Sequence, residues 1–265
     1  MGEAGLTIGG AVIISFITWT VLFWLIFFLQ PHRSYRWNGR MVACIHGIVI
    51  SLLSLVFGIW FNPSPFTEPG SESNVYEVLV MVICLGYFIF DSFWCLWSNV
   101  YGKETNLFII HHMVAFAGMV TSLYLGVSGT ETNSTIFLAE VTNPLMQFRW
   151  FMREVGLKVH NVWYEINDFI FIVTYLTLRV GLSLYLAYCE VIHPQPTDIF
   201  KFLAVSFTVM NIILSVGIAQ FAYRKYTVMY KDIKQWNNTG ERQLCVKDYG
   251  QLRNGSTTFD REHGD

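Results

Sequence analysis

Two adjacent histidines, His111 and His112, stand near the start of the apolar stretch FIIHHMVAFAGMVTSLYLG, residues 108–126. An ionisable ring in a lipid-embedded helix costs free energy unless a partner or a polar cavity receives it, so such residues mark functional sites by default. An imidazole that a carboxylate orients can act as a general base or as a nucleophile, because the carboxylate stabilises the imidazolium. We expect Asp91 to supply that carboxylate, which makes all three residues candidate catalytic groups.

Metal ligation is the other chemistry that paired histidines support. Neighbouring residues on a helix point about 100° apart, so the two rings diverge. No further His or Cys accompanies them at convincing ligand spacing, although His46 and nearby acids leave a metal site open as an alternative. The five cysteines include no C-x-x-C pair. We therefore predict neither a zinc site nor a disulfide framework.

The composition indicates a membrane protein. Hydrophobic residues make up 53% of the chain and charged residues 14%, whereas soluble proteins carry about 25% charged residues. A helix needs about 20 apolar residues to cross the hydrocarbon layer. The chain is thus predicted to be an all-α integral membrane protein with about seven transmembrane helices, at residues 7–29, 41–61, 76–97, 106–126, 134–152, 165–188 and 199–222. Glu140, Asn143 and Pro144 interrupt the fifth of these.

The basic residues lie almost entirely on one side of these spans. Short loops that carry Lys and Arg stay in the cytosol. Fifteen of the seventeen Lys and Arg residues fall in segments 30–40, 98–105, 149–164 and 223–265. Lys and Arg are absent from the alternate loops 62–75, 127–133 and 189–198. We predict a luminal N-terminus, a cytosolic C-terminus and, from its polar composition, a disordered tail over 223–265.

Polar residues from several spans share one depth. With a rise of about 1.5 Å per residue, the histidine pair lies about 8 Å inside the cytosolic end of its span. Asp91, on the preceding span, reaches a similar level. The same cytosolic third holds the candidate residues His46, Asn143 and Asp168, and Glu140 lies one turn deeper. Such a layer predicts a polar cavity that opens toward the cytosol and binds substrate.

Helix periodicity predicts which of these residues share one face of a helix. The stripe of His111 continues through the small residues Ala115, Gly118 and Ser122, which allow close helix contact or leave room for a ligand. Glu140, Asn143 and Gln147 share another stripe. Arg179, near the middle of its span, requires a counter-charge. We expect Glu140 to provide it.

Each polar residue also has a purely structural interpretation. His46 is then a hydrogen-bonded core residue. Asp168 is an acid that favours the start of a helix through the helix dipole. Arg179 with Glu140 is then a structural ion pair. The adjacent histidines with Asp91 at matching depth favour a functional site most.

Several motifs together resemble the TLC domain, which is shared by translocon-associated TRAM proteins and ceramide synthases. They are RMVACIHG, LGYFIFD ending at Asp91, the histidine pair, and LGVSGTE followed by FLAEVTNPLMQFRWFMREVG. The resemblance covers residues 36–222. It implies a six-helix bundle around a cavity that faces the cytosol, with an N-terminal transmembrane helix, residues 1–35, packed outside.

The resemblance also implies a function in lipid metabolism or membrane lipid homeostasis. In ceramide synthases the equivalent histidine pair belongs to the active site, to which acyl-CoA delivers an acyl group. By analogy, His111 in particular is the expected acyl acceptor or base, with acyl-CoA as co-substrate and no bound cofactor. The downstream acids of the ceramide-synthase motif are not reproduced here. Acyl transfer therefore stands beside the alternative of a non-catalytic protein that binds lipid or regulates the membrane.

The expected partners are membrane lipids. No segment indicates nucleic-acid binding, and the sequence leaves the oligomeric state undetermined. A seven-span receptor is disfavoured, because WCLWSNVYGKE stands where an acidic-Arg-Tyr signature is expected. The resemblance points to the endoplasmic reticulum, with the plasma membrane as the alternative.

Overall fold

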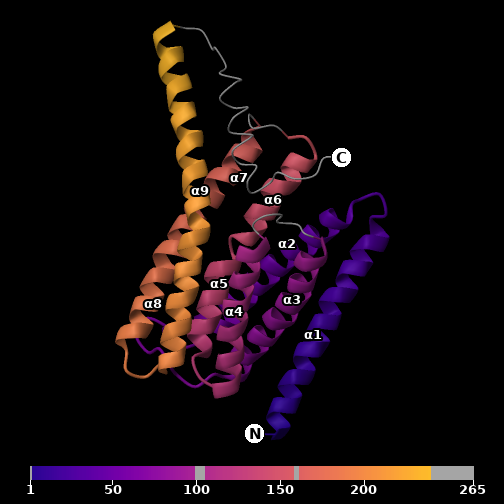
Figure 1. The fold of residues 1–265 in the computed structure, drawn as a ribbon, viewed down its shortest axis with the longest axis vertical. Helices are drawn as coiled ribbons and strands as arrows, with labels where there is room; N and C mark the ends of the chain where they lie inside the picture. The colour runs from indigo at the N-terminus through magenta and orange to yellow at the C-terminus, as the bar shows by residue number, and fades with distance from the viewer. Residues whose placement is uncertain (1, 99–104, 158–160, 240–265) are drawn as a thin grey trace.

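The computed structural model describes residues 2–98, 105–157 and 161–239, and this part of the chain forms a bundle of helices (Figure 1). In chain order its elements are α1 (Gly2–Leu29), α2 (Tyr35–Leu53), the π-helical turn η1 (Ser54–Trp60), α3 (Val75–Ser98), α4 (Thr105–Leu125), α5 (Gly129–Glu140), α6 (Asn143–Glu154), α7 (Val162–Thr174), the π-helical segment η3 (Tyr175–Leu182), α8 (Ser183–Ile192) and α9 (Asp198–Thr239).

Within the described ranges, five helical segments are long and apolar enough to cross a bilayer. They are Thr7–Leu29, Tyr35–Trp60, Val75–Ser98, Val162–Ile192 and Asp198–Lys231, with Ile109–Leu125 as a shorter apolar helix. Helices satisfy their own backbone hydrogen bonds, as hydrocarbon requires. The predicted all-α, multi-pass membrane fold is confirmed.

The fifth predicted span is not one continuous helix. Residues 134–152 instead belong to α5 and α6, which Val141 and Thr142 separate. Pro144 lies in the first turn of α6, where its missing N–H costs least. A Cβ atom placed on Gly47 of α2 would lie 2.8 Å from Pro144 Cδ. The absence of a side chain at Gly47 therefore lets α2 approach the broken helix closely.

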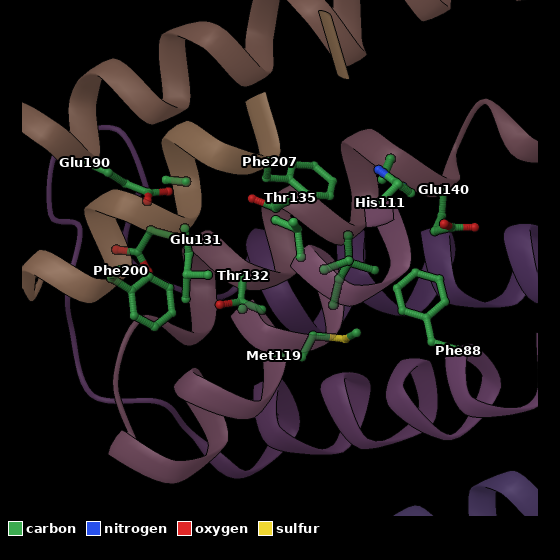
Figure 2. Close-up of a pocket in the computed structure, with 17 residues that line it drawn as sticks. Phe88, His111, Met119, Glu131, Thr132, Thr135, Glu140, Glu190, Phe200 and Phe207 are labelled. Atoms are coloured by element: carbon green, nitrogen blue, oxygen red, sulfur yellow. The ribbon is translucent and has the colours of Figure 1, made fainter. Parts of the chain in front are cut away.

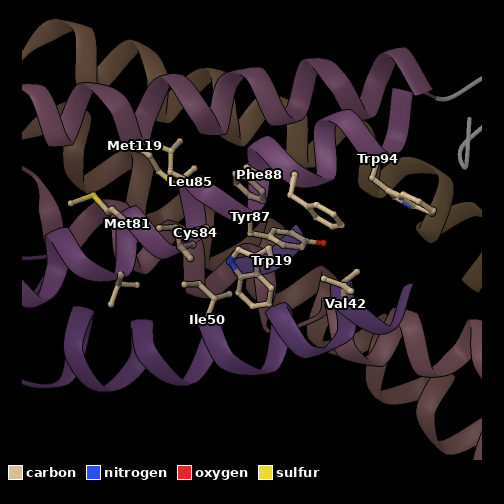
Figure 3. Packing of buried hydrophobic residues seen from close by; sticks show 14 of the residues in the cluster. Trp19, Val42, Ile50, Met81, Cys84, Leu85, Tyr87, Phe88, Trp94 and Met119 are labelled. Atoms are coloured by element: carbon tan, nitrogen blue, oxygen red, sulfur yellow. The ribbon is translucent and has the colours of Figure 1, made fainter. Parts of the chain in front are cut away.

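Helix α1 lies at the edge of the bundle and packs on α3 (Figure 1). Only 17% of its apolar window is buried, against 61% for α3. The main hydrophobic core lies where α1 to α4 meet (Figure 3), and it includes Trp19, Ile50, Met81 and Met119. A smaller core around Phe171 and Tyr175 joins η3 and α7 to α9. This packing holds α2, α3 and α4 firmly around their polar residues.

Helix α9 continues beyond the end of the predicted seventh span at residue 222. Its helical structure reaches Thr239; the first turn of the extension, with Lys225, packs on α7, and the last turns stand clear of the bundle (Figure 1). The prediction of a disordered tail from residue 223 is therefore wrong up to residue 239, since the chain remains helical there. Residues 240–265 lie outside the described part of the chain.

The two ends of the bundle differ in charge. One end, which we call the basic end, carries Arg33, Arg40, Arg149, Arg153 and Arg224. The opposite end, which we call the acidic end, carries Glu68, Glu72, Glu131, Glu190 and Asp198. The termini of α1 follow the same division, with residue 2 at the acidic end and Leu29 at the basic end (Figure 1).

Candidate functional site

Two cavities meet inside the bundle. The larger, here called the basic cavity, opens toward the basic end and encloses about 1660 Å³ with its open mouth included. The smaller, here called the apolar cavity, has about 580 Å³ and extends toward the acidic end (Figure 2). Three residues line both: Phe88, His111 and Glu140. No described side chain of α1 lines either cavity.

Most of the predicted site residues line the basic cavity. It includes His111, His112, Asp91, Glu140, Asn143 and Arg179. They come from α3, α4, α5, α6 and η3, so the structure brings together residues that lie far apart in the sequence. His46 and Asp168 line neither cavity. Six of the eight predicted site residues thus line one cavity.

His112 has the carboxylate partner that the sequence indicated. Its Nε2 lies 3.4 Å from Asp91 Oδ2, and the two side chains are 11% and 13% exposed. The Cys95 thiol lies 3.7 Å from the same carboxylate oxygen. The ring of Phe88 lies beside His112, with 5.2 Å between ring centroids. The carboxylate thus orients His112 rather than its neighbour.

His111 lies on the wall between the two cavities. Its side chain is buried, and its Nδ1 has no hydrogen-bond partner among the residues that the structure describes. The ring packs on Phe207 of α9, with 5.3 Å between centroids. Below it, Ala115 and Gly118 line the apolar cavity, and a Cβ atom on Gly118 would meet nothing within 4 Å. Small residues on this face were predicted either to allow close helix contact or to leave room for a ligand. At Ala115 and Gly118 they leave room.

A chain of polar contacts links α2, α6 and α5 beside the basic cavity. Arg40 Nη1 donates to Gln147 Oε1 at 3.1 Å, and Gln147 Nε2 donates to Asn143 Oδ1 at 2.9 Å. Asn143 Nδ2 in turn donates to Glu140 Oε2 at 3.2 Å. The predicted shared stripe of Glu140, Asn143 and Gln147 is therefore connected by hydrogen bonds. These contacts fix the orientation of the Glu140 carboxylate.

His46 completes that chain but lies behind the cavity wall. Its Nδ1 is 3.5 Å from Glu140 Oε2, and its side chain is fully buried. The ring stacks on Tyr87 at a centroid distance of 3.5 Å and meets the edge of Trp19 from α1. In this structure His46 therefore positions Glu140 and does not contact the cavity, which differs from the substrate-binding role predicted for it.

Arg179 lies close enough to Glu140 for the two charges to interact, but its direct hydrogen bonds go to other groups. Its Nε donates to the Ala139 carbonyl oxygen at 2.8 Å, Nη2 donates to the same oxygen, and Nη1 donates to Tyr175 Oη at 3.4 Å. The physical reason is the break between α5 and α6, because the last carbonyls of a helix have no intrahelical partners. Arg179 satisfies one of them and still lines the basic cavity.

Asp168 belongs to a separate buried ion network. Its Oδ1 lies 2.8 Å from Arg149 Nε, and its Oδ2 lies 2.5 Å from Lys225 Nζ. Lys225 also contacts Glu165 at 2.6 Å. The network ties α6, α7 and α9 together and explains why α9 remains attached beyond the predicted span. Asp168 is thus bound by protein cations, in contrast to the predicted substrate-binding role.

Sequence reasoning missed the cationic lining of the basic cavity. Five arginines contribute to it: Arg40, Arg149, Arg153, Arg179 and Arg224. Four of them lie in segments that the sequence marked only as cytosolic loops or tail. The number of arginines in those segments could have indicated an anion-binding site, since guanidinium groups bind phosphate and carboxylate groups through paired donors. The basic cavity therefore suits the anionic head of an amphiphile.

The residues that the structure describes include no group of three or more His, Cys, Asp or Glu side chains that could hold a metal ion. The side chains at the junction of the cavities carry imidazole, carboxylate and guanidinium groups. Such groups can bind an anion, transfer a proton and supply a nucleophile.

Comparison with known proteins bears on the same region. The sequence profile of the TLC domain matches residues 36–221. TLC domain-containing protein 1 from Gallus gallus is 26% identical over 163 residues, which cover 60% of this chain and 62% of the relative. TLC domain-containing protein 4 A from Dictyostelium discoideum is 28% identical over 158 residues, or 57% of this chain and 58% of the relative. The chain thus spans less than two thirds of the length of these relatives.

Proposed function

Because the chain belongs to the TLC-domain family, we propose that it serves lipid metabolism or membrane lipid homeostasis by binding a single-chain anionic amphiphile, with acyl-CoA as the favoured ligand. The anionic head occupies the basic cavity, and the acyl chain enters the apolar cavity. The basic end faces the cytosol, where coenzyme A is available, in accordance with the charge of the loops. The membrane is that of the endoplasmic reticulum, with the plasma membrane as the alternative.

One observation carries this proposal: His111 lies on the wall that the two cavities share. The bond that joins the head of an amphiphile to its chain would lie at the same boundary. For acyl-CoA this bond is the thioester. A ligand that fills both cavities therefore brings its reactive carbonyl group to an imidazole.

The reaction we propose is acyl transfer in two steps. His111 attacks the thioester carbonyl, the C–S bond breaks as the C–N bond forms, and the imidazole proton leaves with the coenzyme A thiolate. A lipid hydroxyl or amine then attacks the acyl-imidazole and displaces His111. His112, oriented by Asp91, accepts the proton of the attacking group and returns it to the departing imidazole. Both histidines end the cycle neutral.

A second candidate is a lipid-binding protein without catalysis. The observation that favours it is the position of the carboxylates, because Asp91 contacts His112 and not His111. His111 has no oriented proton acceptor at its Nδ1 in the described part of the chain. In that case the cavities hold the amphiphile and the protein regulates or senses membrane composition.

Mass spectrometry of the full chain in mild detergent with labelled acyl-CoA tests these alternatives. We expect an acyl adduct or labelled lipid product with the wild type and neither with His111→Ala. The variant Gly118→Phe should also abolish the signal, because its side chain fills the apolar cavity. Gly10→Leu is the matched control, since its Cβ also meets nothing within 4 Å but lies on α1.

The outcomes separate the two candidates. Bound acyl-CoA or lipid that Gly118→Phe excludes, without adduct or product in any sample, would contradict acyl transfer and support a binding protein. Equal binding by Gly118→Phe and wild type would contradict occupation of the apolar cavity altogether.

A further inference from the structure

Two carboxyl groups, those of Glu131 and Glu190, lie at the far end of the apolar cavity. Figure 2 shows them on the side away from His111 and Glu140, next to Phe200. Glu131 is on α5 and Glu190 is on α8, and both side chains line the cavity. Their residues are only 1% and 3% exposed. A cavity that is otherwise suited to an acyl chain therefore ends at carboxyl oxygens.

These carboxyl groups retain unused hydrogen-bonding capacity. Glu131 Oε1 accepts from the backbone N–H of Gly70, whereas its Oε2 is buried and has no partner among the described residues. Among the described residues the Glu190 side chain has no hydrogen-bond or ion-pair partner, and the charged group that acts on it is the neighbouring Glu131 carboxyl group. A buried polar group without a partner costs free energy. Each glutamate can therefore gain a hydrogen bond from a ligand.

Glu77 at the same end of the bundle provides the contrast. Its Oε1 accepts from Thr130 Oγ1 at 2.5 Å, and its Oε2 accepts from the backbone N–H of Asn74 at 2.8 Å. Glu77 lines neither cavity. Because both of its oxygens are satisfied by the protein, a structural role accounts for it. No such role accounts for the free oxygens of Glu131 and Glu190.

The surface between these carboxyl groups and His111 is mainly apolar. It is formed in part by Met119, Ile136 and Leu203. Glu131 and Glu140 mark the two ends of the cavity on one helix, nine residues apart, so the cavity runs for about 13 Å along α5. An extended aliphatic chain that begins beside His111 therefore brings its distal end to Glu131 and Glu190.

We propose that Glu131 and Glu190 select for chains whose distal end carries a hydrogen-bond donor, specifically an ω-hydroxyl group. This inference rests on the proposed function, since it takes the chain to enter from the basic cavity. A methyl-ended chain that fills the cavity covers the carboxyl oxygens and leaves them unsatisfied. An ω-hydroxyl group donates to one of them. The two glutamates are thus specificity-determining residues for the chain.

A competition between two probes tests the proposal. The full chain in detergent is exposed to an equal mixture of dodecyl phosphate and its ω-hydroxy analogue, and native mass spectrometry gives the ratio of the bound probes. The ratio of bound ω-hydroxy probe to bound dodecyl phosphate is then measured for Glu190→Leu as well. Dividing the wild-type ratio by the variant ratio cancels the different partition of the two probes into micelles. We expect the ω-hydroxy probe to lose about fivefold in relative binding, as one hydrogen bond of about 1 kcal/mol implies.

Two further variants keep the result interpretable. Glu131→Gln retains the bond from Gly70 but places an amide NH₂ where Oε2 was, so an acceptor becomes a donor and the ratio should fall in the same direction. Glu68→Leu, an exposed acid at the same end of the bundle, should leave the ratio unchanged. If Glu190→Leu does not fold, Glu131→Gln alone decides the question.

The failure of this proposal differs from the failure of the proposed function. If both probes bind and the ratio is the same in wild type, Glu190→Leu and Glu131→Gln, the selectivity is refuted and amphiphile binding stands. If neither probe binds to the folded wild type, the two-cavity binding mode itself is refuted and the selectivity with it.

Discussion

Two imidazole–carboxylate pairs lie in the same layer of this protein, and they differ in their surroundings rather than in their spacing. His46 Nδ1 is 3.5 Å from Glu140 Oε2, and His112 Nε2 is 3.4 Å from Asp91 Oδ2. The His46 side chain is completely buried, between Tyr87 and the Trp19 indole of the outer helix. His112 and Asp91 line the basic cavity.

The difference shows which property distinguishes a reactive pair from a structural one. In both places a carboxylate oxygen lies about 3.5 Å from an imidazole nitrogen. Only one of the two imidazoles can meet a ligand, because His46 is enclosed between Trp19 and Tyr87 while its carboxylate partner Glu140 lines the cavities. The buried pair instead joins α2 to the end of α5, which fixes Glu140 beside the cavity. The following predictions test this contrast, from the largest expected effect to the smallest.

Loss of the buried imidazole should be the most destabilising change. His46→Ala leaves the buried Glu140 carboxylate without its imidazole neighbour, although Asn143 still donates to it. Leaving a buried polar group without a partner costs about 1–3 kcal/mol, and the space emptied beside Tyr87 and Trp19 adds to this cost. We expect a corresponding decrease in the free energy of unfolding, measured by denaturation in detergent. His112→Ala is the matched comparison and should cost less, because Asp91 lines the basic cavity, where water can solvate the carboxylate. Equal losses for the two variants would refute the distinction.

Much of the candidate site could be predicted from the sequence, because depth and helix periodicity are local properties. The rise per residue placed Asp91 level with the histidine pair, and the structure brings Asp91 to His112. Spacing along one helix face predicted the contacts of Glu140 with Asn143. Pro144 and its polar neighbours indicated an interruption, and the chain breaks there.

The errors arise where the result depends on how whole helices are rotated and broken. From depth alone, His46 and Asp168 were predicted to line the cavity with the other candidates. The rotation of their helices instead turns His46 toward Tyr87 and Asp168 toward Lys225. The hydrogen bonds of Arg179 could not be predicted, because a free carbonyl at Ala139 exists only once the helix is broken. Glu131 and Glu190 come from segments read as loops, so their contact with the apolar cavity required the packing of α5 against α8.

A smaller effect should follow from filling the contact between α2 and the helix break. Gly47→Ala places a Cβ atom 2.8 Å from Pro144 Cδ, so α6 must move away from α2. Overpacking of this kind costs about 1–3 kcal/mol. We expect the midpoint of thermal unfolding to fall, and the His46–Glu140 pair to be disturbed while the His112–Asp91 pair is retained. Gly118→Ala is the control, since its Cβ meets nothing within 4 Å. An unchanged midpoint for Gly47→Ala would show that the break is not held by this contact.

The smallest expected effect concerns access and leaves stability unchanged. Diethyl pyrocarbonate modifies neutral imidazole rings that it can reach, so peptide-resolved mass spectrometry should find His112 modified in the folded protein and His46 protected. Modification of His46 requires local opening of the packing around Trp19, because the ring is fully buried. Saturation with dodecyl phosphate should then protect His112, whereas exposed His32 should react at the same rate with and without the probe. Comparable modification of His46 and His112 would mean that the reagent reaches both histidines. The difference in burial would then no longer distinguish a structural pair from a reactive one.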